Sequence, residues 1–121
     1  MPKTVMIVDD SASLRQVVNM ALRSAGYEVL EACDGRDALN KLSGQRVHLV
    51  ISDVNMPNMD GITFVREMKK LEPYKFTPVI MLTTEAQEGK KQEGQAAGAK
   101  AWVVKPFQPQ QMLSAVAKLI M

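Results

Sequence analysis

Short apolar runs recur along the chain, separated by stretches of a different spacing. Each run holds four to six residues, mostly apolar or β-branched, between turn signals, which is typical of the buried strands of a parallel sheet. The predicted strands are Val5–Val8, Tyr27–Ala32, Val47–Ile51, Val79–Leu82 and Ala101–Val104. The second run interleaves apolar residues with Glu28 and Glu31, which favours a position near the edge of the sheet.

The intervening stretches place apolar residues three and four positions apart, and this spacing predicts amphipathic helices. We expect them at Leu14–Leu22, Ala38–Leu42, Ile62–Leu71 and from Pro109 onward. Residues that cap helix N-termini precede three of them: Ser11 or Ser13, Asp34 or Asp37, and Asp60. Residues 85–100 hold three glycines and no apolar side chain larger than alanine, so we expect only a marginal fourth helix there.

Strands that alternate with helices predict an α/β fold, a parallel sheet with helices on both faces and right-handed crossovers. The 121 residues suit one domain, and we expect a single domain over residues 1–121. Hydrophobic residues make up 46% of the chain and charged residues 23%, which are globular proportions and do not indicate disorder.

Composition excludes several classes of protein. Cys33 is the only cysteine, so an internal disulfide or a cysteine-based zinc site is excluded, and we expect an inert thiol that is buried or half-buried. No apolar run approaches the ~20 residues of a membrane span, and the N-terminal run is too short for a secretory signal. We therefore expect a cytoplasmic protein. The net charge of +2 is too small to indicate nucleic-acid binding.

The predicted strands end in polar residues. The first is followed by Asp9 and Asp10, the third by Ser52 and Asp53, the fourth by Thr83 and Thr84, and the fifth by Lys105. In an open α/β sheet such residues meet in the crevice at the carboxyl ends of the strands. We therefore expect three carboxylates, a hydroxyl and an ammonium group to converge.

Such a cluster favours a bound cation. Three neighbouring carboxylates repel one another, and Lys105 offsets only one of their charges. Mg²⁺ is the common choice where phosphate is also bound, and it takes only one or two carboxylates directly. One carboxylate then remains as a nucleophile toward phosphorus. The pattern predicts an aspartate that accepts a phosphoryl group, with Lys105 and Thr83 meeting the developing charge.

Four motifs resemble the receiver domain of bacterial response regulators. They are Val8-Asp9-Asp10-Ser11, Ser52-Asp53-Val54-Asn55-Met56-Pro57 with Asp60-Gly61, Thr83-Thr84-Glu85, and Lys105-Pro106-Phe107. The resemblance covers the whole chain, with the motifs in the family's order and spacing, and the chemotaxis type of receiver is the most similar. It implies a single flavodoxin-like (βα)5 domain, doubly wound, with strand order 2-1-3-4-5.

The resemblance also implies a role for each matching residue. Asp53 is the expected phosphoacceptor and Mg²⁺ the expected cofactor, bound directly by Asp10, Asp53 and the Asn55 carbonyl and through water by Asp9. Thr83 is the expected switch hydroxyl. Lys105 is expected to pair with the phosphoryl group and to precede Pro106 through a cis peptide bond. The side chains of Asn55 and Glu85 are expected to tune dephosphorylation.

One position departs from the best-known chemotaxis pattern, in which a tyrosine lies three residues before the lysine. This chain has Trp102, whose indole donates through nitrogen and accepts nothing. A contact that needs a hydroxyl at this position is therefore lost, which weakens the inference of binding to the flagellar motor. Trp102 is expected to report activation through its fluorescence.

The resemblance implies a stand-alone monomeric signalling switch, not an enzyme, that catalyses only its own phosphorylation and dephosphorylation. Expected partners are a chemotaxis histidine kinase and either the flagellar motor switch protein or a phosphatase, with nucleic acid and membrane excluded.

The alternative function is a phosphate sink or a receiver with a non-motor target. A Mg²⁺-dependent phosphohydrolase with an Asp-x-Asp pair is disfavoured, because Asn55 cannot act as the second acid. A flavin or nucleotide module is disfavoured because Asp9 and Asp10 replace a phosphate loop.

Overall fold

A five-stranded parallel sheet forms the centre of the computed structural model, which describes residues 2–84 and 91–120. The strands are β1 (Thr4–Val8), β2 (Glu28–Ala32), β3 (Leu49–Asp53), β4 (Val79–Thr83) and β5 (Ala101–Val104). Their order is β2-β1-β3-β4-β5, and every neighbouring pair is parallel. The predicted fold class and strand order are confirmed, and β2 lies at an edge as its alternating pattern indicated.

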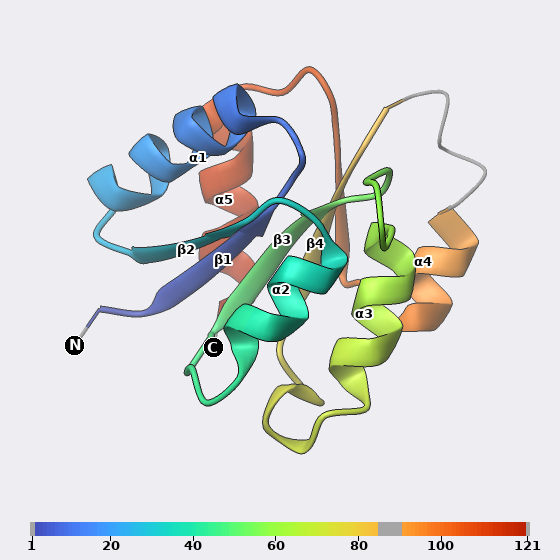
Figure 1. Ribbon diagram of the computed structural model, residues 1–121. Helices are drawn as coiled ribbons and strands as arrows, with labels where there is room; N and C mark the ends of the chain where they lie inside the picture. Colours follow the sequence, from blue (N-terminus) through green and yellow to red (C-terminus); the bar gives the residue numbers. More distant parts are fainter. Residues whose placement is uncertain (1, 85–90, 121) are drawn as a thin grey trace.

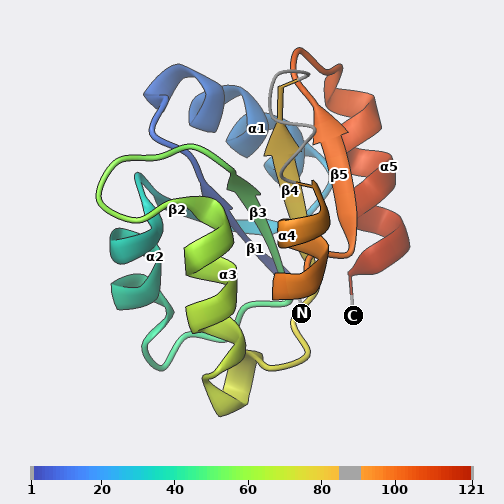
Figure 2. The same ribbon diagram turned by 90° about the vertical axis from the view of Figure 1, so that its right-hand side faces the viewer.

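Helices cover both faces of this sheet (Figures 1 and 2). They are α1 (Ala12–Ser24), α2 (Gly35–Leu42), α3 (Gly61–Lys69), α4 (Lys91–Ala97) and α5 (Pro109–Leu119), with a short 3-10 helix η1 (Glu72–Tyr74) after α3. One core lies under α1 and α5, where Leu22 and Met112 pack on the sheet. The other lies under α2, α3 and α4 and includes Phe64 and Met68.

Local sequence signals set the helix starts. Ser11, Asp34 and Asp60 each accept a hydrogen bond from the backbone N–H three residues later, so they are the N-caps of α1, α2 and α3. Pro109 is the first residue of α5, where its missing N–H costs nothing. Of the marginal helix predicted over residues 85–100, the structure describes α4, and residues 85–90 lie outside the described part.

Two predictions differ from the structure. The third strand runs from Leu49 to Asp53, two residues later than the apolar run, because its pairing with β1 and β4 continues through Ser52 and Asp53. Cys33 is exposed rather than buried or half-buried. It follows the last residue of β2, where its backbone N–H donates to Asp37 and its thiol donates to Asp34 at 3.9 Å.

None of the helices among the described residues is both long and apolar enough to cross a bilayer. The expected cis peptide bond between Lys105 and Pro106 is present.

Candidate functional site

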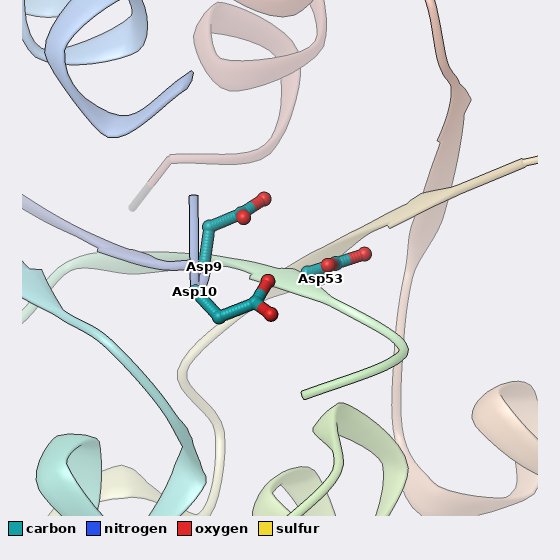
Figure 3. A group of neighbouring side chains, drawn as sticks. All are labelled: Asp9, Asp10 and Asp53. Carbon is teal, nitrogen blue, oxygen red and sulfur yellow. The ribbon is translucent and has the colours of Figure 1, made fainter. Parts of the chain in front are cut away.

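The carboxylates of Asp9, Asp10 and Asp53 lie at the carboxyl edge of the sheet and project to the same side of it (Figure 3). One oxygen from each lies within 4.8 Å of the others. Asp9 and Asp10 directly follow β1 and Asp53 ends β3, and these two strands are neighbours in which Val8 lies opposite Ser52. The predicted convergence of these acids is thus confirmed.

Asp9 is completely buried, whereas Asp10 is exposed. The Asp9 Oδ1 atom accepts the backbone N–H of Ser11 at 2.8 Å, so this carboxylate also orders the turn that leads into α1. Its Oδ2 atom accepts a hydrogen bond from the Lys105 Nζ atom at 3.2 Å. Asp9 therefore has defined partners for both oxygens, and Asp10 is the acid of the pair that faces solvent.

Asp53 is the last residue of β3 and is nearly buried. Its Oδ1 atom accepts the backbone N–H of Val54 at 2.9 Å and lies 3.3 Å from the Lys105 Nζ atom. Burial, and then the negative charge of Asp9, raise the pKa of the Asp53 carboxyl above its ordinary value, while the Lys105 ammonium partly offsets them. The surroundings of Asp53 thus disfavour its ionised form, because one ammonium group does not fully offset burial and the charge of Asp9.

Lys105 follows β5 and places its ammonium between Asp9 and Asp53. The three carboxylates carry more negative charge than the single ammonium group can offset. Their oxygen atoms lie together at the carboxyl edge of the sheet. Carboxylate oxygens are the ligands that hard divalent cations prefer, so this cluster could hold a metal ion.

The remaining predicted site residues take different positions. Thr83 ends β4 and is buried, and its hydroxyl donates to the Thr84 carbonyl at 3.1 Å. The backbone N–H of Lys105 donates to the Thr83 carbonyl at 2.6 Å, which brings the two residues to one edge. Asn55 is exposed just beyond β3. Glu85 lies outside the described residues.

Trp102 lies in the middle of β5, opposite Met81, and its half-buried ring packs on the core beneath α4. The ring occupies the place where a side chain at Gly94 of α4 would stand, since a Cβ atom there would lie 2.2 Å from the ring. The indole Nε1 atom is buried and has no hydrogen-bond partner among the described residues. Trp102 therefore contacts α4 directly.

Two supports of the site were not predicted. The Arg15 Nη1 atom donates to the Asp9 carbonyl at 2.6 Å, and its Nε atom donates to Glu31 at 3.1 Å, so α1 and β2 together hold the Asp9–Asp10 turn. Asp34 accepts a hydrogen bond from Asn58 of the loop after β3, at 2.8 Å. The sequence marked Asp34 only as a helix cap, and no local signal marks Arg15 or Asn58.

Comparison with known proteins accounts for this arrangement. The family model of the response regulator receiver domain matches residues 5–117. The chain belongs to the response regulator receiver family. This receiver is 38% identical over 120 residues to the chemotaxis protein CheY of Thermotoga maritima, and the match covers 98% of each chain.

Solved structures agree with this assignment. The receiver superposes on the chemotaxis protein CheY4 of Vibrio cholerae with a TM-score of 0.94 and 49% identity, covering 99% of this chain and 100% of that one. The receiver domain of the sensor histidine kinase PA1611 from Pseudomonas aeruginosa, with a magnesium ion coordinated in its active-site cleft, matches with a TM-score of 0.89 and 27% identity over 98% of each chain. This receiver is thus a CheY-like domain of two-component signalling, and such domains accept phosphate from histidine kinases.

Proposed function

We propose that this receiver is a chemotaxis switch in which Asp53 accepts a phosphoryl group from a histidine kinase of the chemotaxis type, with Mg²⁺ as cofactor. The single observation that carries the proposal is the position of Lys105, whose ammonium lies between Asp9 and Asp53 in a cluster of three carboxylates. In this proposal the protein catalyses only its own phosphorylation and dephosphorylation.

The donor set fits Mg²⁺. All three side chains offer oxygen atoms, and the similar PA1611 receiver has a magnesium ion coordinated in its active-site cleft. We assign Asp10, Asp53 and the Asn55 backbone carbonyl as direct ligands. Asp9 acts through water, because both of its oxygens already accept hydrogen bonds from Ser11 and Lys105. When bound, Mg²⁺ would neutralise carboxylate charge and attract the oxygens of the incoming phosphoryl group.

Asp53 supplies the nucleophile. Its Oδ1 atom accepts contacts from Val54 and Lys105, and Oδ2 forms the bond to phosphorus. The bond between phosphorus and the donor's histidine nitrogen breaks at the same time, and its electron pair leaves with that nitrogen. Asp53 reacts as the carboxylate, so no proton has to be removed from it. Asn55 and Glu85 are assigned to tuning the later attack of water.

The phosphoryl group then changes the contacts of its neighbours. It adds about two negative charges and new acceptor oxygens. The Lys105 ammonium, already 3.3 Å from Asp53, is placed to pair with them. We assign the Thr83 hydroxyl as a second donor, and the Thr83 backbone carbonyl accepts the N–H of Lys105. Because Lys105 and Trp102 lie on the same chain segment, we expect this rearrangement to reach the face formed by α4, β5 and α5.

The test is covalent labelling by acetyl phosphate in the presence of Mg²⁺. The wild-type protein should gain one phosphoryl group, and Asp53→Asn should gain none, because an amide does not attack phosphorus. Asp37→Asn is the matched control, since it removes a carboxylate from α2 and should label normally. Labelling of another residue in Asp53→Asn would refute the assignment.

Trp102 favours a second candidate function, a receiver that drains phosphate from a kinase or acts on a partner other than the motor. The indole lacks a hydroxyl and packs against α4 through Gly94. Binding of the flagellar motor switch protein to the wild-type receiver, with and without beryllofluoride as a phosphoryl mimic, separates the two. Binding that tightens with the mimic supports the motor role, and the absence of binding supports the second function.

A further inference from the structure

The loop between β3 and α3 carries the Asn55 carbonyl, and its two ends are fixed beside Asp53. The backbone N–H of Val54 donates to the Leu82 carbonyl at 3.2 Å, and that of Gly61 donates to the Val54 carbonyl at 2.8 Å. A Cβ atom at Gly61 would lie only 1.9 Å from the Asp53 carbonyl oxygen, so this approach requires glycine. These contacts fix the ends of the loop but leave its middle to be held by other elements.

The middle of the loop is held by the start of α2. The Asn58 Nδ2 atom donates to the Asp34 Oδ2 atom at 2.8 Å, and the Gly35 N–H donates to the Met59 carbonyl at 3.2 Å. A Cβ atom at Gly35 would lie 2.8 Å from the Met59 side chain, so the loop packs closely on α2. Asn58 has a φ of 66°, in the left-handed region that asparagine tolerates better than most residues.

Asp34 performs two tasks with two oxygens. Its Oδ1 atom accepts the Asp37 N–H at 2.7 Å and caps α2, while Oδ2 accepts from Asn58. The side chain is nearly buried, so neither bond is easily replaced by water. When an asparagine at this position keeps the cap with its one carbonyl oxygen, its amide nitrogen faces Asn58 as a donor, so the bond from Asn58 to a charged oxygen is lost.

We propose that Asp34 is a positioning residue of the metal site: through Asn58 it holds the loop so that the Asn55 carbonyl is presented to the cation. The inference rests on the proposed function, because it concerns the same site. Partners beyond the ligands orient the groups that bind a metal, and their loss commonly lowers metal affinity by about tenfold or more. Asp34 is proposed to act entirely through the loop, without contact with the ion.

The experiment measures Mg²⁺ affinity by calorimetry in two variants that remove the same hydrogen bond. Asp34→Asn keeps the helix cap, because asparagine caps as well as aspartate. Asn58→Gly removes the side chain and still accepts the left-handed backbone. We expect each variant to bind Mg²⁺ about tenfold more weakly than wild type. The double variant should bind no more weakly than the weaker single variant, because both remove one interaction.

Asp37→Asn is the charge control. It removes a carboxylate from the same turn of α2, but its partners are the Cys33 N–H and Lys41 rather than the loop. Its Mg²⁺ affinity should equal that of wild type. If Asp37→Asn weakens binding as much as Asp34→Asn, charge and not positioning is responsible, and the inference is wrong.

Hydrogen exchange without metal provides a second measurement. The Gly35 amide, which donates to Met59, should exchange faster in Asp34→Asn and Asn58→Gly than in wild type. Unchanged Mg²⁺ affinity in both variants would overturn the positioning role, even if their thermal stability falls. Absence of Mg²⁺ binding by the wild-type protein would instead overturn the proposed function.

Discussion

Individual carboxylate oxygens have separate partners in this protein. Asp9 orders the α1 turn with one oxygen and faces Lys105 with the other, and Asp34 divides its oxygens between the α2 cap and Asn58. A carboxylate that accepts hydrogen bonds is stabilised in its charged form. At these positions an aspartate-to-asparagine change keeps the shape of the side chain but replaces one acceptor oxygen with a donor.

This division predicts a pH-dependent contribution of Asp34 to stability. Bonds from the Asp37 N–H and then Asn58 lower the pKa of the Asp34 carboxyl below its ordinary value of 3.8, against the opposing effect of burial. The folded protein therefore gains stability from ionised Asp34 above pH 3.8, and this gain is lost as the pH falls through the lowered folded pKa. At pH 7, Asp34→Asn should reduce the free energy of unfolding by about 1–2 kcal/mol.

Urea unfolding of wild type and Asp34→Asn from pH 7 down to acid measures this contribution. The difference between the two proteins should stay constant at neutral pH and shrink in the acid range. Asn58→Gly, which keeps the α2 cap, should show a smaller loss of acid dependence than Asp34→Asn. A difference that is the same at every pH would contradict the role of the ionised carboxylate.

Helix α4 and strand β5 approach each other closely at Gly94 and Trp102. The Trp102 ring fills the space in which a side chain at position 94 would stand, and its polar nitrogen is buried there. In an isolated helix, glycine costs about 1 kcal/mol relative to alanine. At Gly94 this cost is offset by the packing of a large aromatic ring against the helix backbone.

We therefore expect Gly94→Ala to destabilise the protein by about 1–3 kcal/mol, because the new Cβ atom overlaps the indole. In a Trp102→Ala background the same change should instead stabilise by about 1 kcal/mol, since only helix propensity remains. Trp102 is the only tryptophan, so its emission should shift to longer wavelength in Gly94→Ala as the ring moves toward water. Gln95→Ala, at an exposed neighbouring position, should leave the emission unchanged.

At the scale of the whole molecule, the sheet order brings distant segments of the chain into one site. β1 and β3 are adjacent at the centre, and Asp9 and Lys105 meet although 96 positions separate them. The unfolded chain does not hold these groups together, so a cation at the site binds the folded state selectively. Metal binding and folding are then coupled.

Mg²⁺ at ten times its dissociation constant should raise the free energy of unfolding by about 1.4 kcal/mol. For a domain of this size the corresponding rise in melting temperature is roughly 5 °C. Thermal scans with Mg²⁺ and after addition of EDTA measure the effect, which should be reversible. Asp10→Asn, which removes a proposed ligand, should show a much smaller rise, and an equal rise in this variant would show that Mg²⁺ acts elsewhere.

Local patterns predicted most of the fold. Apolar runs identified all five strands, and cap residues such as Ser11 and Asp60 fixed helix starts, because burial and capping depend on neighbours in sequence. Polar strand ends predicted the carboxylate cluster because parallel strands share one carboxyl edge. The end of β3 was misplaced by two residues because its polar last residues, Ser52 and Asp53, still pair in the sheet.

Contacts between distant residues could not be predicted in this way. The exposure of Cys33 depends on which way a turn faces. The bond between Asp34 and Asn58, and the fit of Trp102 on Gly94, depend on how two elements are placed in space. The pattern of one sequence does not contain this spatial information. These contacts depend on how α2, α4 and β5 pack in the folded domain.

The long separation between Asp9 and Lys105 has a consequence for synthesis. During synthesis Asp9, Asp10 and Asp53 leave the ribosome well before Lys105. In the folded domain the Lys105 ammonium lies between Asp9 and Asp53. Until β5 has emerged and joined β4, the acids lack their shared counterion and the sheet lacks an edge strand. If Asp53 is the phosphoacceptor, we therefore expect the nascent chain to accept a phosphoryl group only after β5 has joined the sheet and Lys105 has reached the acids.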